Sequence, residues 1–294
     1  MQIFLDDHCF ISYFRDIKEK YSSIELMIEL MEFILKADPL ELFIPQDFFS
    51  LNIDGMTVAE LVYGDNLDPS NRDLVARFEH IVRVAEQVPN DIKDGPTAAA
   101  GLKAAGRGGL ITNSECEALV WWRAARMHKI FNQINLRSSV RKFFVTEKLP
   151  ETELSNYSET MFESIYFHCP IEHVKHLGVK YVKSIGTIIK HFSYLNDLAI
   201  SDFNDSRDDR ERTTRAGKEG VNMTPESNST RNNKNAMQQR EVTILDVPIS
   251  CEWHTKITPN HGRIHFYTRA CQHEQFKKRI GNKLIIGIIC KHLD

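Results

Sequence analysis

The chain lacks a strong excess of charge of either sign. Its 294 residues carry 37 Lys and Arg against 40 Asp and Glu, which gives a formal net charge of -3 at neutral pH. A nearly balanced charge provides no overall attraction to nucleic acid. Any binding of phosphate must therefore come from a local group of basic residues.

The chain also lacks paired cysteines and long apolar runs. Its six cysteines are scattered and never form a C-x-x-C pair, so they are expected to be free thiols or small buried side chains, not a disulfide framework or a zinc knuckle. No run approaches the roughly 18 apolar residues of a membrane span, and the first residues lack the basic-then-apolar pattern of a signal peptide. We expect a soluble, cytoplasmic protein with no membrane partner.

Composition and periodicity predict an α+β protein in two parts. A mostly helical domain is expected over residues 1–200, because apolar residues recur there at helical spacing. Residues 201–240 are dominated by polar and charged types and are expected to be a disordered linker or mobile loop. Residues 241–294 hold three segments rich in β-branched and aromatic residues, which predict a C-terminal antiparallel β-meander. The expected helices cover residues 24–35, 57–63, 73–87, 112–134, 151–167 and 181–198.

The β-meander gathers polar side chains on one face. Side chains alternate between the two faces of a strand, and two strands joined by a tight turn are neighbours. Residues 241–257 and 263–269 would form such a pair, with the turn at Asn260–Gly262. The polar row expected on one face contains Glu252, His254, Lys256, Arg263, His265, Tyr267 and Arg269.

This row is suited to phosphodiester cleavage without a metal. His254 and His265, with ordinary pKa values near ~6.5, can act as general base and general acid. Lys256 and Arg263 can stabilise the charge that develops on phosphorus, and Tyr267 completes the predicted catalytic set. RNA carries its own nucleophile in the 2′-hydroxyl, so RNA is favoured over DNA and neither a metal nor another cofactor is expected.

Two other interpretations of this face remain open. A solvated face of an antiparallel sheet normally carries His, Lys, Arg and Tyr side chains without any chemistry. Alternatively, His254, His265 and His292 could hold a zinc ion. The neighbouring Lys256 and Arg263 would oppose a cation at that position, which favours the metal-free interpretation.

The most basic stretch of the chain lies further towards the N-terminus. It includes Arg137, Arg141 and Lys142, which with Arg269 are predicted to contact nucleic acid. A solvated helix face is the alternative explanation for the three residues of that stretch.

The C-terminal segments resemble a known group of proteins. Cys251-Glu252-Trp253-His254-Thr255-Lys256, Gly262-Arg263-Ile264-His265-Phe266 and Leu284–Leu293 resemble an uncharacterised bacterial family associated with mobile and phage-defence islands. The final hairpin is also similar to the last strands of RelE-type toxins, which are small β-sheet ribonucleases that use basic, His and Tyr residues without a metal. The resemblance implies a toxin-like ribonuclease in antiviral defence.

A second, weaker pattern lies at the N-terminus. Asp6 and Asp7 follow a short apolar run, and with later acids such as Glu60 and Glu115 they resemble a PIN-type nuclease with metal-binding carboxylates. A helix cap with surface acids is the alternative explanation for these residues.

The leading hypothesis is therefore a nucleic-acid-acting effector, a metal-independent ribonuclease. The rival is a non-catalytic subunit of a defence or toxin-like complex that binds a protein partner or nucleic acid. The two hypotheses differ in geometry. A nuclease requires His254, Lys256, Arg263 and His265 to converge on one cleft, whereas on a binding subunit they can diverge along an open surface.

Overall fold

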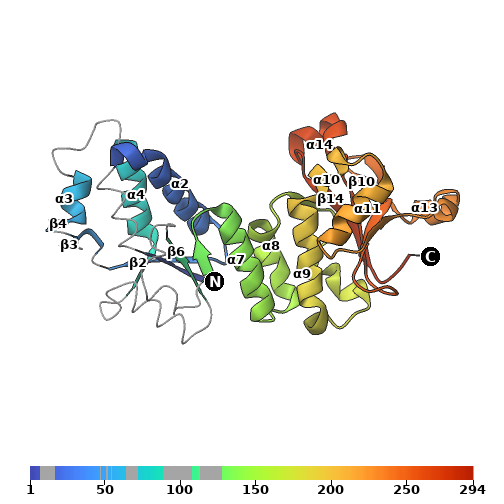
Figure 1. Cartoon of the computed structure of the whole chain (residues 1–294), viewed down its shortest axis with the longest axis horizontal. Helices are drawn as coiled ribbons and strands as arrows, with labels where there is room; N and C mark the ends of the chain where they lie inside the picture. The colour runs from blue at the N-terminus through green and yellow to red at the C-terminus, as the bar shows by residue number, and fades with distance from the viewer. Residues whose placement is uncertain are drawn as a thin grey trace. The chain divides into compact units, whose positions relative to one another are not determined.

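A computed structural model describes residues 1–6, 17–46, 48–50, 52–53, 55–63, 72–88, 108–112 and 128–293. The chain divides into two compact units, Met1–Phe143 and Phe144–Asp294, whose elements are labelled in Figure 1. Helices and β-sheets are both present, consistent with the predicted α+β class. No helix in these described ranges is long and apolar enough to cross a membrane.

The first unit is built on a parallel sheet of five strands. The strand order is β5-β2-β1-β6-β7, and every neighbouring pair is parallel. The strands are short. All four residues of β6 are buried, whereas β1 and β2 alternate between buried apolar residues and residues that are at least partly exposed, such as Gln2 and Glu41. Their bounds are β1 Gln2–Leu5, β2 Glu41–Pro45, β5 Glu86–Val88, β6 Gly108–Ile111 and β7 His128–Ile130.

Two amphipathic helices of this unit, α2 (Ile17–Lys36) and α4 (Arg72–Val84), pack side by side (Figure 1). Their apolar residues recur at helical spacing and are buried. Arg77 of α4 makes a two-pronged ion pair with Glu32 of α2, with N···O distances of 2.8 and 3.0 Å. The smaller elements are η1 Phe48–Ser50, β3 Asn52–Ile53, β4 Met56–Thr57 and α3 Val58–Tyr63, and α7 Gln133–Thr146 follows β7.

This sheet departs from the mostly helical domain expected over residues 1–200. The helices expected at 24–35, 57–63, 73–87 and 181–198 correspond to α2, α3, α4 and α9 (Tyr181–Asp197). The helix expected at 151–167 is wrong in its last part, because Leu154–Met161 form α8 but Ile165–Phe167 form strand β8. The helix expected at 112–134 falls largely outside the described residues, and its last part contains β7. Strands of three to five residues are too short for periodicity to separate them from helix, which explains the difference.

The second unit is built on a mixed sheet of five strands. The order is β8-β14-β13-β12-β9, in which β8 runs parallel to β14 and the other pairs are antiparallel. A separate two-stranded ribbon, β10–β11, precedes β12. The strands are β8 Ile165–Phe167, β9 Met223–Pro225, β10 Glu241–Ile244, β11 Val247–Ser250, β12 Trp253–Lys256, β13 Arg263–Tyr267 and β14 Leu284–Cys290.

Aromatic packing joins the helices of this unit to its sheet. Phe192 of α9 lies 5.5 Å from Phe167 of β8 and 5.4 Å from Phe162, measured between ring centroids. The remaining helical elements are η4 Glu151–Glu153, α8 Leu154–Met161, η5 Ile171–Leu177, α10 Ala199–Asp205, α11 Asp209–Lys218, α12 Asn228–Arg231, α13 Lys234–Gln238, η6 Ala270–Gln272 and α14 Glu274–Arg279.

Residues 201–240, expected to be a flexible linker, differ most from the prediction. They contain most of α10, then α11, β9, α12 and α13, and β9 is the edge strand of the second unit's sheet. The polar side chains have defined structural roles, because Asp208, Ser227 and Asn233 each cap the helix that follows. The few apolar side chains are well placed, since Val221 and Met223 are 1% and 0% exposed. Caps and ion pairs therefore replace the large core that composition suggested was missing.

The meander expected over residues 241–294 is part of this larger sheet. The antiparallel pairs β12–β13 and β13–β14 are present as expected. The first expected strand, however, is divided into β10, β11 and β12 by a turn at Leu245 and Asp246, whose φ angles are +50° and +64°. The flanking strands β8 and β9 come from outside the segment.

Two glycines test whether residues 201–240 are ordered in solution. Gly217 lies in α11 with open space around it, so Gly217→Ala should raise the free energy of unfolding by about 0.5 kcal/mol. Gly220 has a φ of +68°, so Gly220→Ala should lower the free energy of unfolding by about 1–2 kcal/mol. Urea denaturation measures both changes. If neither substitution changes the free energy of unfolding, residues 201–240 form a flexible linker instead.

Candidate active site

The predicted polar row is formed by two adjacent strands. In the register of β12 and β13, His254 lies opposite His265 and Lys256 lies opposite Arg263. The two imidazole rings are 4.9 Å apart between centroids. All four side chains line one pocket of about 470 Å³. The structure therefore brings together the four residues whose convergence was the criterion for an enzyme.

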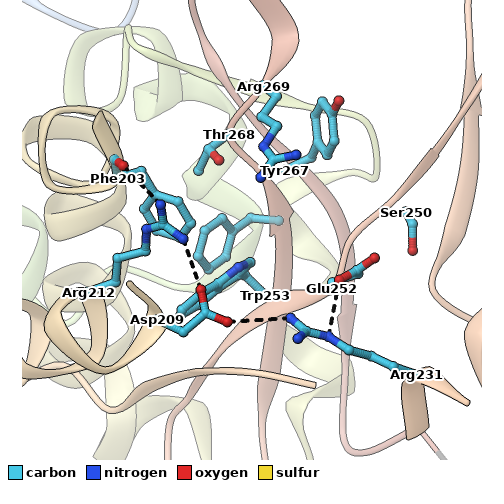
Figure 2. Close-up of a pocket in the computed structure, with 11 residues that line it drawn as sticks. Phe203, Asp209, Arg212, Arg231, Ser250, Glu252, Trp253, Tyr267, Thr268 and Arg269 are labelled. Atoms are coloured by element: carbon cyan, nitrogen blue, oxygen red, sulfur yellow. Dashed lines mark hydrogen bonds and ion pairs between the residues drawn. The ribbon is translucent and has the colours of Figure 1, made fainter. Parts of the chain in front are cut away.

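Three other residues predicted for this row lie elsewhere. Glu252 does not line this pocket and pairs with Arg231 at 3.2 Å. Tyr267 packs against the core cluster under the β10–β11 ribbon, and its hydroxyl lies 3.0 Å from Nε2 of His273. It lies beyond the end of β12, whose first residue, Trp253, pairs with Phe266. Arg269 and Tyr267 line a different pocket, which is drawn in Figure 2.

The pocket contains a carboxylate, Glu226, that strand alternation did not predict. Glu226 follows the edge strand β9, and its backbone N–H donates to the carbonyl of Glu252 at 2.9 Å. Its Oε1 lies 3.1 Å from Nε of Arg240, 3.3 Å from Nδ1 of His254 and 3.7 Å from Nδ1 of His265. Glu226 lies in the segment expected to be a linker, so no sequence pattern connected it to the two histidines.

The charge state of this cluster follows from burial and from its close contacts. Burial alone would raise the pKa of Glu226, but the close contacts with His254 and Arg240 outweigh burial and lower the pKa to about 2. Burial lowers the pKa of His254; Glu226 opposes this shift, while Lys256 and Arg263 add to it. At neutral pH Glu226 is therefore an anion and His254 is a neutral imidazole.

His265 differs from the predicted general acid. It is 1% exposed, and burial, reinforced by His254, lowers its pKa to about 3. Its Nδ1 lies 3.3 Å from the carbonyl oxygen of Cys251, to which the neutral ring can donate a hydrogen bond. A histidine that stays neutral at physiological pH holds no transferable proton for a leaving group.

The contacts of His254 select one tautomer of its ring. Glu226 lies beside Nδ1, whereas the Thr224 hydroxyl lies 3.4 Å from Nε2. A carboxylate accepts a hydrogen bond, so the ring proton is favoured on Nδ1 and the lone pair on Nε2. In this tautomer Nε2 can accept a proton while Glu226 stabilises the cation that forms.

Three basic side chains surround the cluster. Burial and the neighbouring Arg263 lower the pKa of Lys256 below its ordinary value. Arg263 also closes the turn before β13, because its guanidinium donates to the carbonyls of Thr258, Pro259 and Gly262. Arg240 is 4% exposed and pairs with Glu226. Three cations against one carboxylate make the pocket suitable for an anion.

Three residues of the same cluster could also hold a metal ion. Glu226, His254 and His265 each offer a ligand atom, and these atoms lie within 4.8 Å of one another. This set differs from the three-histidine zinc site considered from the sequence, although His292 also lines the pocket. Nδ1 of His254 and Nε2 of His265 are buried without an aligned hydrogen bond, as ligands would be. The guanidinium on Oε1 and the nearby Lys256 nevertheless favour an anion over a divalent cation.

The basic stretch predicted to contact nucleic acid lies on α7. Lys142 is exposed, Arg137 is half-buried and Arg141 is 9% exposed. The three residues therefore do not share one open surface, and burial keeps Arg141 from acting as a surface contact.

The first unit has its own candidate position, at the carboxyl ends of β1 and β6. The chain builds β1, β2 and β5 outward in one direction and then crosses to β6 on the other side of β1. Asp6 follows β1 and is fully buried, and it accepts a hydrogen bond from the hydroxyl of Thr112, which follows β6. In open parallel sheets, ligands bind at the carboxyl ends where the strand order reverses.

The other acids of the PIN-type pattern are less informative. Asp7 and Glu115 lie outside the described residues. Glu60 lies in α3, where its carboxylate accepts hydrogen bonds from the backbone N–H and hydroxyl of Thr57, at 2.7 and 2.8 Å. These bonds form a helix cap, which was the alternative explanation for this acid.

Comparisons of the chain with known proteins identify no relative. No family model matches the sequence, and no curated protein or solved structure is similar to it.

Proposed function

We propose that the second unit cleaves RNA without a metal, and that its active site is the pocket around His254. The observation that carries the proposal is the contact between Glu226 and Nδ1 of His254, inside a pocket that Lys256 and Arg263 also line. A buried carboxylate behind a neutral histidine is an arrangement that makes the far ring nitrogen a general base.

The proposed reaction is an internal transesterification. Nε2 of His254 takes the proton of the 2′-hydroxyl, and the 2′-oxygen attacks the adjacent phosphorus. The bond from phosphorus to the 5′-oxygen breaks, and the ammonium of Lys256 gives that oxygen a proton. The products are a 2′,3′-cyclic phosphate and a 5′-hydroxyl end. Solvent then takes the proton from His254 and returns one to Lys256.

The remaining residues hold the site and stabilise charge. Arg263 keeps the turn closed and adds positive charge where the phosphorane forms. His265 stays neutral and packs against the ring of His254, which restricts the orientation of that ring. The convergence on a pocket favours this function over the rival binding subunit, for which an open surface would be enough.

The first prediction concerns the base and the acid. His254→Ala and Lys256→Ala should each lower kcat roughly 10²–10⁴-fold on single-stranded RNA, with EDTA present throughout. The wild-type rate should rise with pH as His254 loses its proton below 6.5, and it should fall as Lys256 loses its proton below 10.5. Initial rates across a pH series measure both limbs.

The matched control is His261→Ala, which removes an exposed histidine of the turn that does not line the pocket. Circular dichroism establishes that each variant is folded. Full EDTA-resistant activity in folded His254→Ala would refute the proposal.

A second prediction separates the role of Glu226 from a structural one. Glu226 raises the pKa of His254, so Glu226→Gln should lower kcat and move the acidic limb of the pH profile to lower pH. The amide can still accept the hydrogen bond from Arg240. A lower rate with an unshifted acidic limb would show that Glu226 only supports the fold.

We propose a second function for the first unit, metal-dependent phosphodiester cleavage at the carboxyl ends of β1 and β6. The supporting observation is the burial of the Asp6 carboxylate at the point where the strand order reverses. Asp6 also belongs to the sequence pattern that resembles PIN-type nucleases. Asp6 would be one oxygen ligand of a divalent cation, which would activate water for attack on phosphorus.

Asp6→Asn tests this second function, because the amide oxygen can still accept the hydrogen bond from Thr112. Any cleavage that requires Mg²⁺ or Mn²⁺ and stops in EDTA should be lost in Asp6→Asn and retained in His254→Ala. Cleavage gels with each variant, with and without chelator, assign each activity to one unit. Metal-dependent cleavage that survives in Asp6→Asn would count against this site.

A further inference from the structure

A second pocket of the second unit lies on the other side of β12. Its lining includes Trp253, whereas the neighbouring His254 faces the pocket already described, as the alternation of a strand requires. Its volume is about 360 Å³, enough for one nucleobase with part of its sugar. The pocket is drawn in Figure 2.

One wall of this pocket is aromatic. Phe203 lies edge-on to Trp253, with ring centroids 4.8 Å apart and an interplanar angle of 76°. Phe203 also lies 5.9 Å from Phe266, which is 1% exposed and therefore belongs to the core beneath the pocket. Trp253 is half-buried, so part of its ring surface remains accessible. A planar base can stack on such a surface whatever its identity.

A chain of alternating charges also lines the pocket, and Figure 2 shows it beside the aromatic side chains. Arg212 lies 2.9 Å from Asp209 and places its guanidinium 5.0 Å from the centre of the Phe203 ring. Arg231 lies 3.7 Å from Asp209 and 3.2 Å from Glu252. These contacts hold the charged wall in place, so the pocket is largely formed before a ligand binds.

Two polar groups of the lining are not used by the fold. Arg269 is exposed, and its guanidinium makes no hydrogen bond or ion pair with any residue that the structure describes. Ser250 has a shielded hydroxyl with no hydrogen-bond partner among those residues. An arginine without a partner can bind a phosphate, and a free hydroxyl can bind the edge of a base.

We propose that this pocket binds one nucleotide unit, with the base on Trp253, the base edge at Ser250 and the phosphate on Arg269. Helix α12 separates this pocket from the His254 pocket, because Ser227 and Thr230 line one and Arg231 lines the other. The nucleotide can come from a free mononucleotide or from a single-stranded RNA that passes over α12. Binding here does not depend on catalysis at His254.

The test is a set of binding titrations with the full chain. AMP, GMP, CMP, UMP and a six-nucleotide single-stranded RNA are titrated separately by isothermal calorimetry. Arg269→Gln should weaken the binding of the preferred ligand roughly tenfold and flatten its salt dependence. Trp253→Leu should weaken binding by roughly tenfold or more, because the stacked base loses its platform.

Arg279→Gln is the matched control, because it makes the same chemical change at an exposed arginine outside the pocket. His254→Ala should bind as the wild type does, which separates this proposal from the proposed catalysis. Binding of mononucleotides would identify a free nucleotide as the ligand, and binding of the oligonucleotide alone would identify RNA. Equal affinities in the wild type, Arg269→Gln and Arg279→Gln, or no binding of any of the ligands, would overturn the proposal, even if Trp253→Leu did not fold.

Discussion

One carboxylate, that of Glu226, connects most of the features that give the second unit its chemical character. It contacts Arg240 at the start of the β10–β11 ribbon, His254 on β12 and His265 on β13. These groups are all less than 10% exposed, and a buried charge without partners would cost several kcal/mol. The edge strand β9, the ribbon and the two central strands are therefore held in one arrangement by the need to keep this charge paired.

The same need sets the reactivity of the pocket. Glu226 remains ionised because Arg240 compensates its burial, and it favours the proton of His254 on the ring nitrogen that faces it. His265, which burial keeps neutral, occupies the space behind and adds no competing charge at neutral pH. The result is one basic nitrogen, Nε2 of His254, in a pocket where the negative charge of Glu226 is outnumbered by the positive charges of Arg240, Lys256 and Arg263. This combination suits a phosphodiester better than a neutral or cationic substrate.

The short segment between β9 and β10 lies between the two pockets of the second unit. Residues Ser227 and Thr230 face the His254 pocket, whereas Arg231 faces the aromatic one. The chain uses two polar caps and two ion pairs to hold this segment, since it has few apolar side chains to bury. A segment that composition marks as disordered is thus the wall between the catalytic pocket and the nucleotide pocket that we propose.

The sequence by itself determined the pairing of β12 with β13, and with it the approach of His254 to His265. Two apolar-alternating segments around a turn with Gly262 leave little choice of register, because a slip of one residue would expose the buried face. The same local pattern also marked Lys256 and Arg263 as neighbours. Helices α2 and α9 were equally evident, because their apolar stripes extend over many turns.

Only the tertiary structure decided the rest. Glu226 joins the histidines through the pairing of β9 with β12, a contact between segments nearly thirty residues apart in the chain that no local period encodes. The parallel sheet of the first unit, which places Asp6 beside Thr112, pairs strands over a hundred residues apart. Strands this short carry too little periodicity to be recognised, and their partners are selected by burial and by satisfaction of backbone hydrogen bonds in the folded chain.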